Sequence, residues 1–297
     1  MAEQREGFDG LDIGGRTVAG LASRPRVTVW AAVAATALLA WVLLAAMAAE
    51  TARLDPTAPG SWIAELLPVL DVPWIGALLA LCIAPAGPLA ATGPAFVALA
   101  AMWMLMSMAT MLPSAAPLVR TYCEIADTAA GKGEPAVHPF VLVGGYVSVW
   151  LAASLAFAGI GLAGMAHAGT GGALSPLTGM AGASALALAG VYQFSSFKEA
   201  CLKKCRRPFS ILFARWSTRP AAIFRLGLEQ GVWCLGCCWA LMLVMFAVGV
   251  MNLAWMALIA LFALVEKETR GTLASRVAGA ILLVWSAALL LVSVPAS

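Results

Sequence analysis

The chain has 297 residues, of which 62% are hydrophobic and only 11% are charged, and its formal net charge is +3. Soluble domains are about 45–50% apolar and about 25% charged, so this composition excludes an ordinary soluble protein and leaves no room for a large soluble domain.

Apolar runs long enough to cross a bilayer recur along the chain. A helical crossing needs about 20 apolar residues, and such runs lie at residues 27–49, 74–118, 139–165, 174–196, 231–267 and 272–294. They predict an all-α polytopic transmembrane helix bundle, with residues 27–297 as one transmembrane domain behind a cytoplasmic N-terminal tail of residues 1–26. The first run is too long for a signal peptide, so we expect an uncleaved helix there.

Two of these runs are too long for one straight helix. Prolines and glycines between residues 85 and 94 predict a broken or re-entrant piece at 74–93, followed by a true crossing at 94–118 that Pro113 kinks or ends. A sharply bent pair of structural helices is the alternative for the broken piece. Gly249 and Asn252 divide the run 231–267 into two short helices joined by a tight turn.

The placement of charge predicts the orientation of the chain. Basic residues mark cytoplasmic loops, and the loop 197–230 carries many of them, whereas the loop 50–73 is mainly acidic and the loop 164–173 is uncharged. With the basic tail also inside, we expect seven crossings, a cytoplasmic N-terminus and an external C-terminus. The basic residues of the loop 197–230 are Lys198, Lys203, Lys204, Arg206, Arg207, Arg215, Arg219 and Arg225.

Two cysteine clusters stand out against this apolar background. Cys201 and Cys205 are four residues apart, and Cys234, Cys237 and Cys238 follow the i, i+3, i+4 spacing. Each cluster therefore presents its sulfurs on one face of a helix. The topology places the first pair in the basic loop and the second group in the first turns of the next helix, so both are expected at the cytoplasmic membrane face.

Gathered thiolates are typical of soft-metal sites or of redox exchange. We expect the basic loop and a helix N-terminus to lower the pKa values of these thiols. Zinc would use four of the five sulfurs and Cu(I) two or three. His138 and His167 lie far away along the chain, which favours an all-sulfur site. Inert packing is the alternative reading of all five, and Cys82 and Cys123 are interpreted as structural.

Methionine and glycine patterns indicate further candidate metal ligands and a helix-packing contact. Met104, Met108 and Met111 share a helix face and could extend a Cu(I) site, although methionine also fills irregular cores. Gly227 and Gly231 form a Gly-x3-Gly pair that is typical of close helix packing.

Other functional classes find little support. Ionisable residues are nearly absent from the apolar runs, which argues against a proton-driven pump. No phosphate loop, Ser-His-Asp pattern, zinc-protease motif or nucleic-acid module is present. The expected partners are the bilayer, a metal ion and a membrane or soluble protein. Catalysis is left open: a membrane thiol oxidoreductase using the same cysteines, or a structural subunit of a membrane complex, are the alternatives to metal handling.

Several segments carry a family resemblance over residues 95–267. They are Met-Leu-Pro-Ser-Ala-Ala-Pro at 111–117, Ala-Gly-Val-Tyr-Gln at 189–193, Lys198, Cys-Leu-x2-Cys-Arg-x-Pro at 201–208, Gly-x2-Cys-Leu-Gly-Cys-Cys-Trp-Ala-Leu-Met at 231–242, Gly-Val-Met-Asn at 249–252 and Glu266-Lys267. With these the chain resembles a bacterial family of predicted metal-binding integral membrane proteins, catalogued as a domain of unknown function.

The resemblance implies metal binding and a place in the bacterial inner membrane. Thr110 and Gln230 depart from it, since relatives often have methionine and histidine at these positions. All five clustered cysteines are kept, so the expected cargo is Cu(I) or zinc, held by sulfur for handling or delivery.

Overall fold

Every regular element in the described part of the chain is an α-helix. The computed structural model describes residues 25–54, 93–168, 176–249, 252–269 and 271–293. Its helices are α2 (Pro25–Leu54), α5 (Gly93–Ser114), α6 (Ala116–Gly131), α7 (Pro139–Ala168), α8 (Pro176–Tyr192), α9 (Ser196–Cys205), α10 (Pro208–Ala214), α11 (Pro220–Val248), α12 (Leu253–Glu268) and α13 (Leu273–Ser293). The all-α prediction is confirmed.

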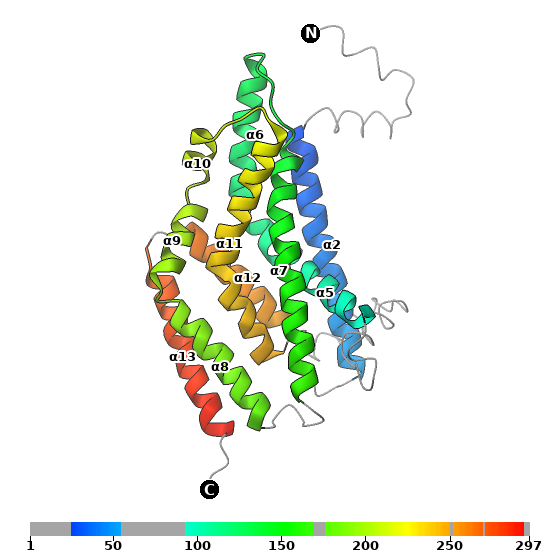
Figure 1. Cartoon of the computed structure of the whole chain (residues 1–297), viewed down its shortest axis with the longest axis vertical. Helices are drawn as coiled ribbons and strands as arrows, with labels where there is room; N and C mark the ends of the chain where they lie inside the picture. Colours follow the sequence, from blue (N-terminus) through cyan, green and yellow to red (C-terminus); the bar gives the residue numbers. More distant parts are fainter. Residues whose placement is uncertain (1–24, 55–92, 169–175, 250–251, 270, 294–297) are drawn as a thin grey trace.

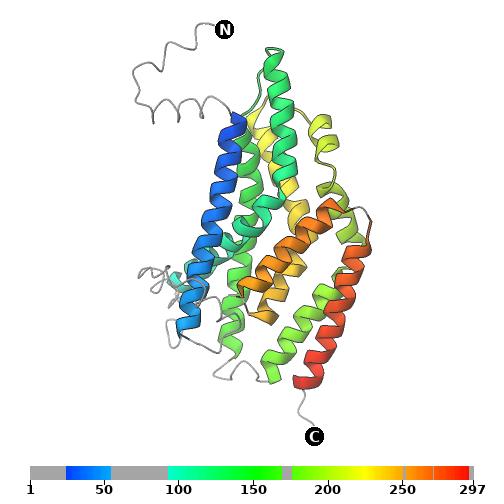
Figure 2. The ribbon, with the colours of Figure 1, turned by 180° about the vertical axis from the view of Figure 1, so that it is seen from behind.

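The long helices alternate in direction along the long axis of the molecule (Figures 1 and 2). α2, α7, α11 and α13 run one way, and α5, α8 and α12 run the other. Among the described residues, α2, α5, α7, α11 and α13 are long and apolar enough to span a membrane, and α8 is a shorter apolar helix. The alternation is consistent with the expected topology, and the count of seven crossings stays a prediction.

The predicted boundaries are confirmed for some runs and corrected for others. The turn near Gly249 and Asn252 separates α11 from α12 as predicted, but α11 is a long helix of 29 residues. The stretch expected as a basic loop at 197–230 is largely helical, because Pro208 and Pro220 each begin a new helix there. The expected broken piece at 74–93 lies, up to residue 92, outside the described residues.

Glycines let α7 and α11 pack closely enough to bring their main chains together. A methyl group built on Gly227 would lie 2.1 Å from the carbonyl oxygen of Leu142, and one on Gly145 would lie 2.2 Å from that of Phe224. Gly231 likewise faces Val149 and the Tyr146 carbonyl. The packing role predicted for the Gly-x3-Gly pair is therefore confirmed, and it brings Tyr146 of α7 close to α11.

Pro113 leaves carbonyl groups free in the last turn of α5, and these accept hydrogen bonds from side chains of other helices. Pro113 lies inside the last turn and has no N–H to donate to Ala109. The Ala109 carbonyl instead accepts a hydrogen bond from Trp41 Nε1 of α2 at 3.0 Å. The carbonyl of Met111, also in the last turn, is similarly free to accept hydrogen bonds from side chains.

Candidate metal centre

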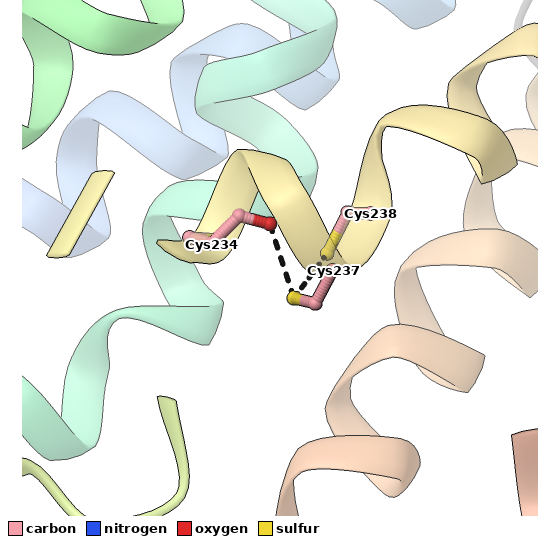
Figure 3. A group of neighbouring side chains, drawn as sticks. All are labelled: Cys234, Cys237 and Cys238. Carbon is pink, nitrogen blue, oxygen red and sulfur yellow. Dashed lines mark hydrogen bonds between the residues drawn. The ribbon is translucent and has the colours of Figure 1, made fainter. Parts of the chain in front are cut away.

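Three cysteine sulfurs of α11 meet inside the protein. The Sγ atoms of Cys234, Cys237 and Cys238 all lie within 4.8 Å of one another, and the three residues are buried. The Cys237 thiol lies 3.2 Å from Cys238 Sγ and donates a hydrogen bond to the Cys234 carbonyl at 3.0 Å (Figure 3). The i, i+3, i+4 spacing thus has the consequence predicted from the sequence: the sulfurs share one helix face.

The position of this group along α11 differs from the prediction. α11 begins at Pro220, so Cys234 lies about four turns into the helix rather than in its first turns. The favourable effect of a helix N-terminus on negative charge fades within the first turn. The helix dipole therefore cannot stabilise thiolates at this position, and another positive group must do so.

Lys267 at the end of α12 supplies that positive group. Its ammonium donates hydrogen bonds to Cys234 Sγ at 3.2 Å and to Ser114 Oγ of α5 at 2.6 Å. A charge-assisted bond of this kind favours the thiolate form of a buried sulfur. From the sequence we expected the basic residues of 197–230 to supply this positive charge, but the cation comes from α12.

Tyr146 of α7 completes the surroundings of Cys234. Its hydroxyl donates to the Met111 carbonyl at 2.9 Å and lies 3.0 Å from Cys234 Sγ. Because a phenol has a single proton, it can donate either to the Met111 carbonyl or to a Cys234 thiolate, and a Cys234 thiol can donate to the phenol oxygen. Helices α5, α7, α11 and α12 therefore converge on one sulfur.

Cys201 of α9 packs directly against the cysteine helix. A methyl group on Gly236 would lie 2.7 Å from Cys201 Sγ, so only glycine allows this approach. Burial raises the pKa of the Cys201 thiol, contrary to the expected effect of the basic loop. The reason is that Lys203 and Lys204 point to solvent while Cys201 faces inward.

Cys205 lies at the end of α9 and connects the inner sulfurs with the surface. It is half-buried and interacts with the Cys237 thiol. It also lines a cavity of about 20 Å³ between α5, α6, α7, α9, α11 and α12. The residues around the cavity are Ser114, Ala115, Pro117, Leu118, Tyr146, Cys205, Gln230, Cys234 and Lys267.

The five clustered cysteines are therefore brought to one region, with three of them forming the tight group. A model of the PpoB2 family, described as copper chaperone, matches residues 100–289 of this chain. The protein belongs to the PpoB2 copper chaperone family. No curated protein and no solved structure matches it.

Membership of the PpoB2 family supports the prediction of a metal-related function and gives copper as the metal to consider. The matched residues include all five clustered cysteines as well as Tyr146 and Lys267. The chain thus combines a copper chaperone family match with a buried group of three sulfurs that could hold a soft metal ion.

The methionines predicted as further ligands occupy different surroundings in this PpoB2 protein. Met104 Sδ accepts a hydrogen bond from Ser154 Oγ at 3.9 Å, on the side of α7. Met108 and Met111 are buried in the core, and Met111 reaches the site through its carbonyl oxygen. A ligand role for the three thioethers stays a prediction.

Cys123 and His138 do not belong to the sulfur group. Cys123 is buried in α6, where burial raises the pKa of its thiol to about 11. His138 is exposed and accepts a hydrogen bond from the Phe140 amide at 3.3 Å. His167 belongs to the far end of α7, and Cys82 is outside the described residues.

A buried ion pair holds the end of α12 in place beside the sulfur group. Lys198 Nζ lies 2.8 Å from Glu266 Oε1, and both side chains are 1% exposed. Gln193 accepts a hydrogen bond from the same ammonium, and Ser275 donates one to Glu266. Arg206 donates to the Glu266 carbonyl at 2.7 Å, which ties α9 to the same helix end.

These buried polar groups were not predicted from the sequence. Ionisable residues are nearly absent from the apolar runs, and Glu266 lies at the end of one. A usable signal existed, because Lys198, Glu266 and Lys267 stood among the residues that carry the family resemblance. Their side chains are long enough to reach from the end of a run into the bundle.

Proposed function

We propose that this protein carries Cu(I) in the bacterial inner membrane, holds it on the sulfurs of Cys234, Cys237 and Cys238 near the cytoplasmic face, and delivers it to a partner protein. The observation that carries the proposal is the buried group of three sulfurs within 4.8 Å of one another, one of which is bonded to Lys267. Family membership supports copper as the cargo. The basic residues of 197–230 support a cytoplasmic position.

The number of sulfurs favours Cu(I) over zinc. Structural zinc sites use four ligands in a closed tetrahedral shell. The tight group offers three, and Cys201 and Cys205 stand beside it. Thiolates are soft ligands that select Cu(I).

The net charge of the site also favours Cu(I) over zinc. When two of the three sulfurs bind Cu(I) as thiolates and the third keeps its proton, the site carries one net negative charge, which the Lys267 ammonium neutralises. Two thiolates that bind Zn²⁺ are already neutral, so the ammonium would add an uncompensated positive charge. Buried net charge is costly. Lys267 is therefore a determinant of metal choice in this proposal.

The alternative use of the same sulfurs, thiol–disulfide exchange, has weaker support. An attacking thiolate must reach the sulfur of its partner. Cys234, the most exposed of the three, is only 3% exposed. A small ion can enter such a site, whereas a protein disulfide cannot.

Metal competition tests the proposal. Anaerobic protein is incubated with equal amounts of Cu(I) and Zn²⁺, desalted, and analysed for both metals. We expect about one copper per chain and little zinc, because soft sulfur ligands prefer Cu(I). Retention of neither metal would contradict the proposal and favour a structural subunit, and retention of zinc alone would make zinc the cargo.

Replacing Lys267 by glutamine tests the charge argument. Glutamine can still donate a hydrogen bond to Ser114 but carries no charge. Loss of a partner in the outer shell of a metal site costs roughly 10- to 100-fold in affinity. We expect a loss of that size for Cu(I), measured by competition with a Cu(I) chelator, and no loss for Zn²⁺. Lys204→Gln, which removes an exposed cation from α9, is the matched control. An equal loss for both metals would contradict the charge argument.

A further inference from the structure

The inner sulfurs are closed off from solvent, so a metal ion needs a route to them. Cys234, Cys237 and Cys238 are 3%, 1% and 0% exposed, and Cys201 is 1% exposed. Of the five clustered cysteines, Cys205 alone is half-buried rather than buried. It is therefore the thiol of the set that a copper donor can reach from outside.

The cavity beside Cys205 leads from this outer thiol to the inner group. Cys205 and Cys234 both line it, and its volume of about 20 Å³ suits one particle of about the size of a water molecule. An organic molecule does not fit in that space. The cavity thus has a thiol toward the surface, a thiol of the inner group, and room for a single ion between them.

One polar group on the cavity wall lacks a hydrogen-bond partner among the described residues. Gln230 is 5% exposed and lines the cavity, and its Nε2 has no hydrogen-bond partner within the part of the chain that the structure describes. A buried donor without a partner costs free energy, so it calls for an explanation. A thiolate or a metal-bound sulfur in the cavity would provide an acceptor for this amide.

We propose that Cys205 is the first ligand of incoming Cu(I) and passes the ion through this cavity to Cys234 and Cys237. The inference rests on the proposed function and adds the route of loading. It makes Cys205 a transit ligand that the final complex does not need. Cys205 and Cys234 line the same cavity, which provides the path for the exchange.

Each exchange step balances without a change of oxidation state. Cys205 loses its thiol proton and forms a bond to Cu(I), while one bond from Cu(I) to the donor breaks. The thiols of Cys234 and Cys237 then lose their protons and bind Cu(I). The bond to Cys205 and the remaining bonds from Cu(I) to the donor break, the donor leaves, and the Cys205 sulfur takes up a proton again. Copper stays Cu(I) throughout, and the remaining protons go to the released donor or to water.

The charge around Cys205 suits an anionic donor complex. Lys203, Lys204 and Arg207 are exposed on either side of it. A positive surface around a binding site raises the local concentration and the association rate of anionic ligands. Cu(I) held by bicinchoninate, which is an anionic complex, is therefore a suitable probe, and its absorbance reports transfer directly.

Loading kinetics test the route. The anaerobic protein is mixed with the Cu(I)–bicinchoninate complex, and the loss of absorbance is followed for wild type, Cys205→Ser and Cys123→Ser. We expect Cys205→Ser to load at least about tenfold more slowly, which corresponds to a modest increase in the barrier. Its final copper content should equal that of wild type. Cys123→Ser removes a buried cysteine of α6 and should load at the wild-type rate.

Three outcomes would overturn the inference. A wild-type loading rate in Cys205→Ser would show that copper takes another route, and a lower final copper content would make Cys205 a permanent ligand. Cys205→Met keeps a soft sulfur at the entrance and should load faster than Cys205→Ser, and equal rates for these two variants would also count against the route. Failure of the proposed function gives a different result, because wild type would then take up no copper.

Discussion

Replacing Cys234 and Cys237 together by serine is expected to abolish stoichiometric copper binding. Serine preserves the size of the side chain and its capacity for hydrogen bonds, but its hydroxyl is a poor ligand for a soft metal ion. The change removes two of the three sulfurs that lie within 4.8 Å of one another. The loss of affinity should exceed the roughly 10- to 100-fold that loss of a mere outer-shell partner costs.

The control for this variant must remove a cysteine without touching the site. Cys123→Ser does so, because Cys123 is buried in α6 and lies apart from the sulfur group. Copper per chain is measured after anaerobic loading and desalting. We expect about one ion per chain in wild type and in Cys123→Ser, and almost none in the double variant. Equal copper in all three would place the metal elsewhere.

Breaking the buried ion pair is expected to give the largest loss of stability. Lys198 and Glu266 are each 1% exposed, and their charged atoms are 2.8 Å apart. Removing one partner leaves the other charge buried and uncompensated, at a cost of about 3–5 kcal/mol. Lys198→Met should therefore lower the free energy of unfolding by about that amount. It should also loosen the end of α12, from which Lys267 reaches Cys234.

An exposed pair on the same helix provides the matched control. Lys203 and Glu199 are also 2.8 Å apart, but their side chains are 66% and 41% exposed. Exposed pairs of this kind contribute about 0–1 kcal/mol. Thermal unfolding in detergent should therefore separate Lys198→Met clearly from Lys203→Met. Equal shifts in the two variants would contradict the argument that burial makes the first pair important.

Much of the fold could be predicted from the sequence because bilayer-length apolar runs have few alternatives to helices. The runs at 139–165 and 272–294 correspond closely to α7 and α13. The turn before α12 was predicted from Gly249 and Asn252, and the structure adds that Asn252 Oδ1 caps α12 by accepting a hydrogen bond from the Trp255 amide. The shared face of Cys234, Cys237 and Cys238 followed from helical periodicity alone.

The rest of the site depends on contacts between helices that periodicity cannot supply. Lys267 meets Cys234 from 33 positions away in the chain, and Tyr146 meets it from 88. The helix that carries Cys234 begins at Pro220, inside a stretch whose basic residues suggested a loop. Its start moved the cysteines away from the helix N-terminus, so the positive charge had to come from α12.

Copper-edge X-ray absorption on the loaded wild-type protein tests the central claim most directly. If Cu(I) is held by Cys234, Cys237 and Cys238, the spectrum should show a reduced copper ion with a first shell of two or three sulfurs and no nitrogen or oxygen ligand. The result that would contradict the account is a shell dominated by nitrogen or oxygen, since the sulfur group of α11 would then not be the site that holds the copper.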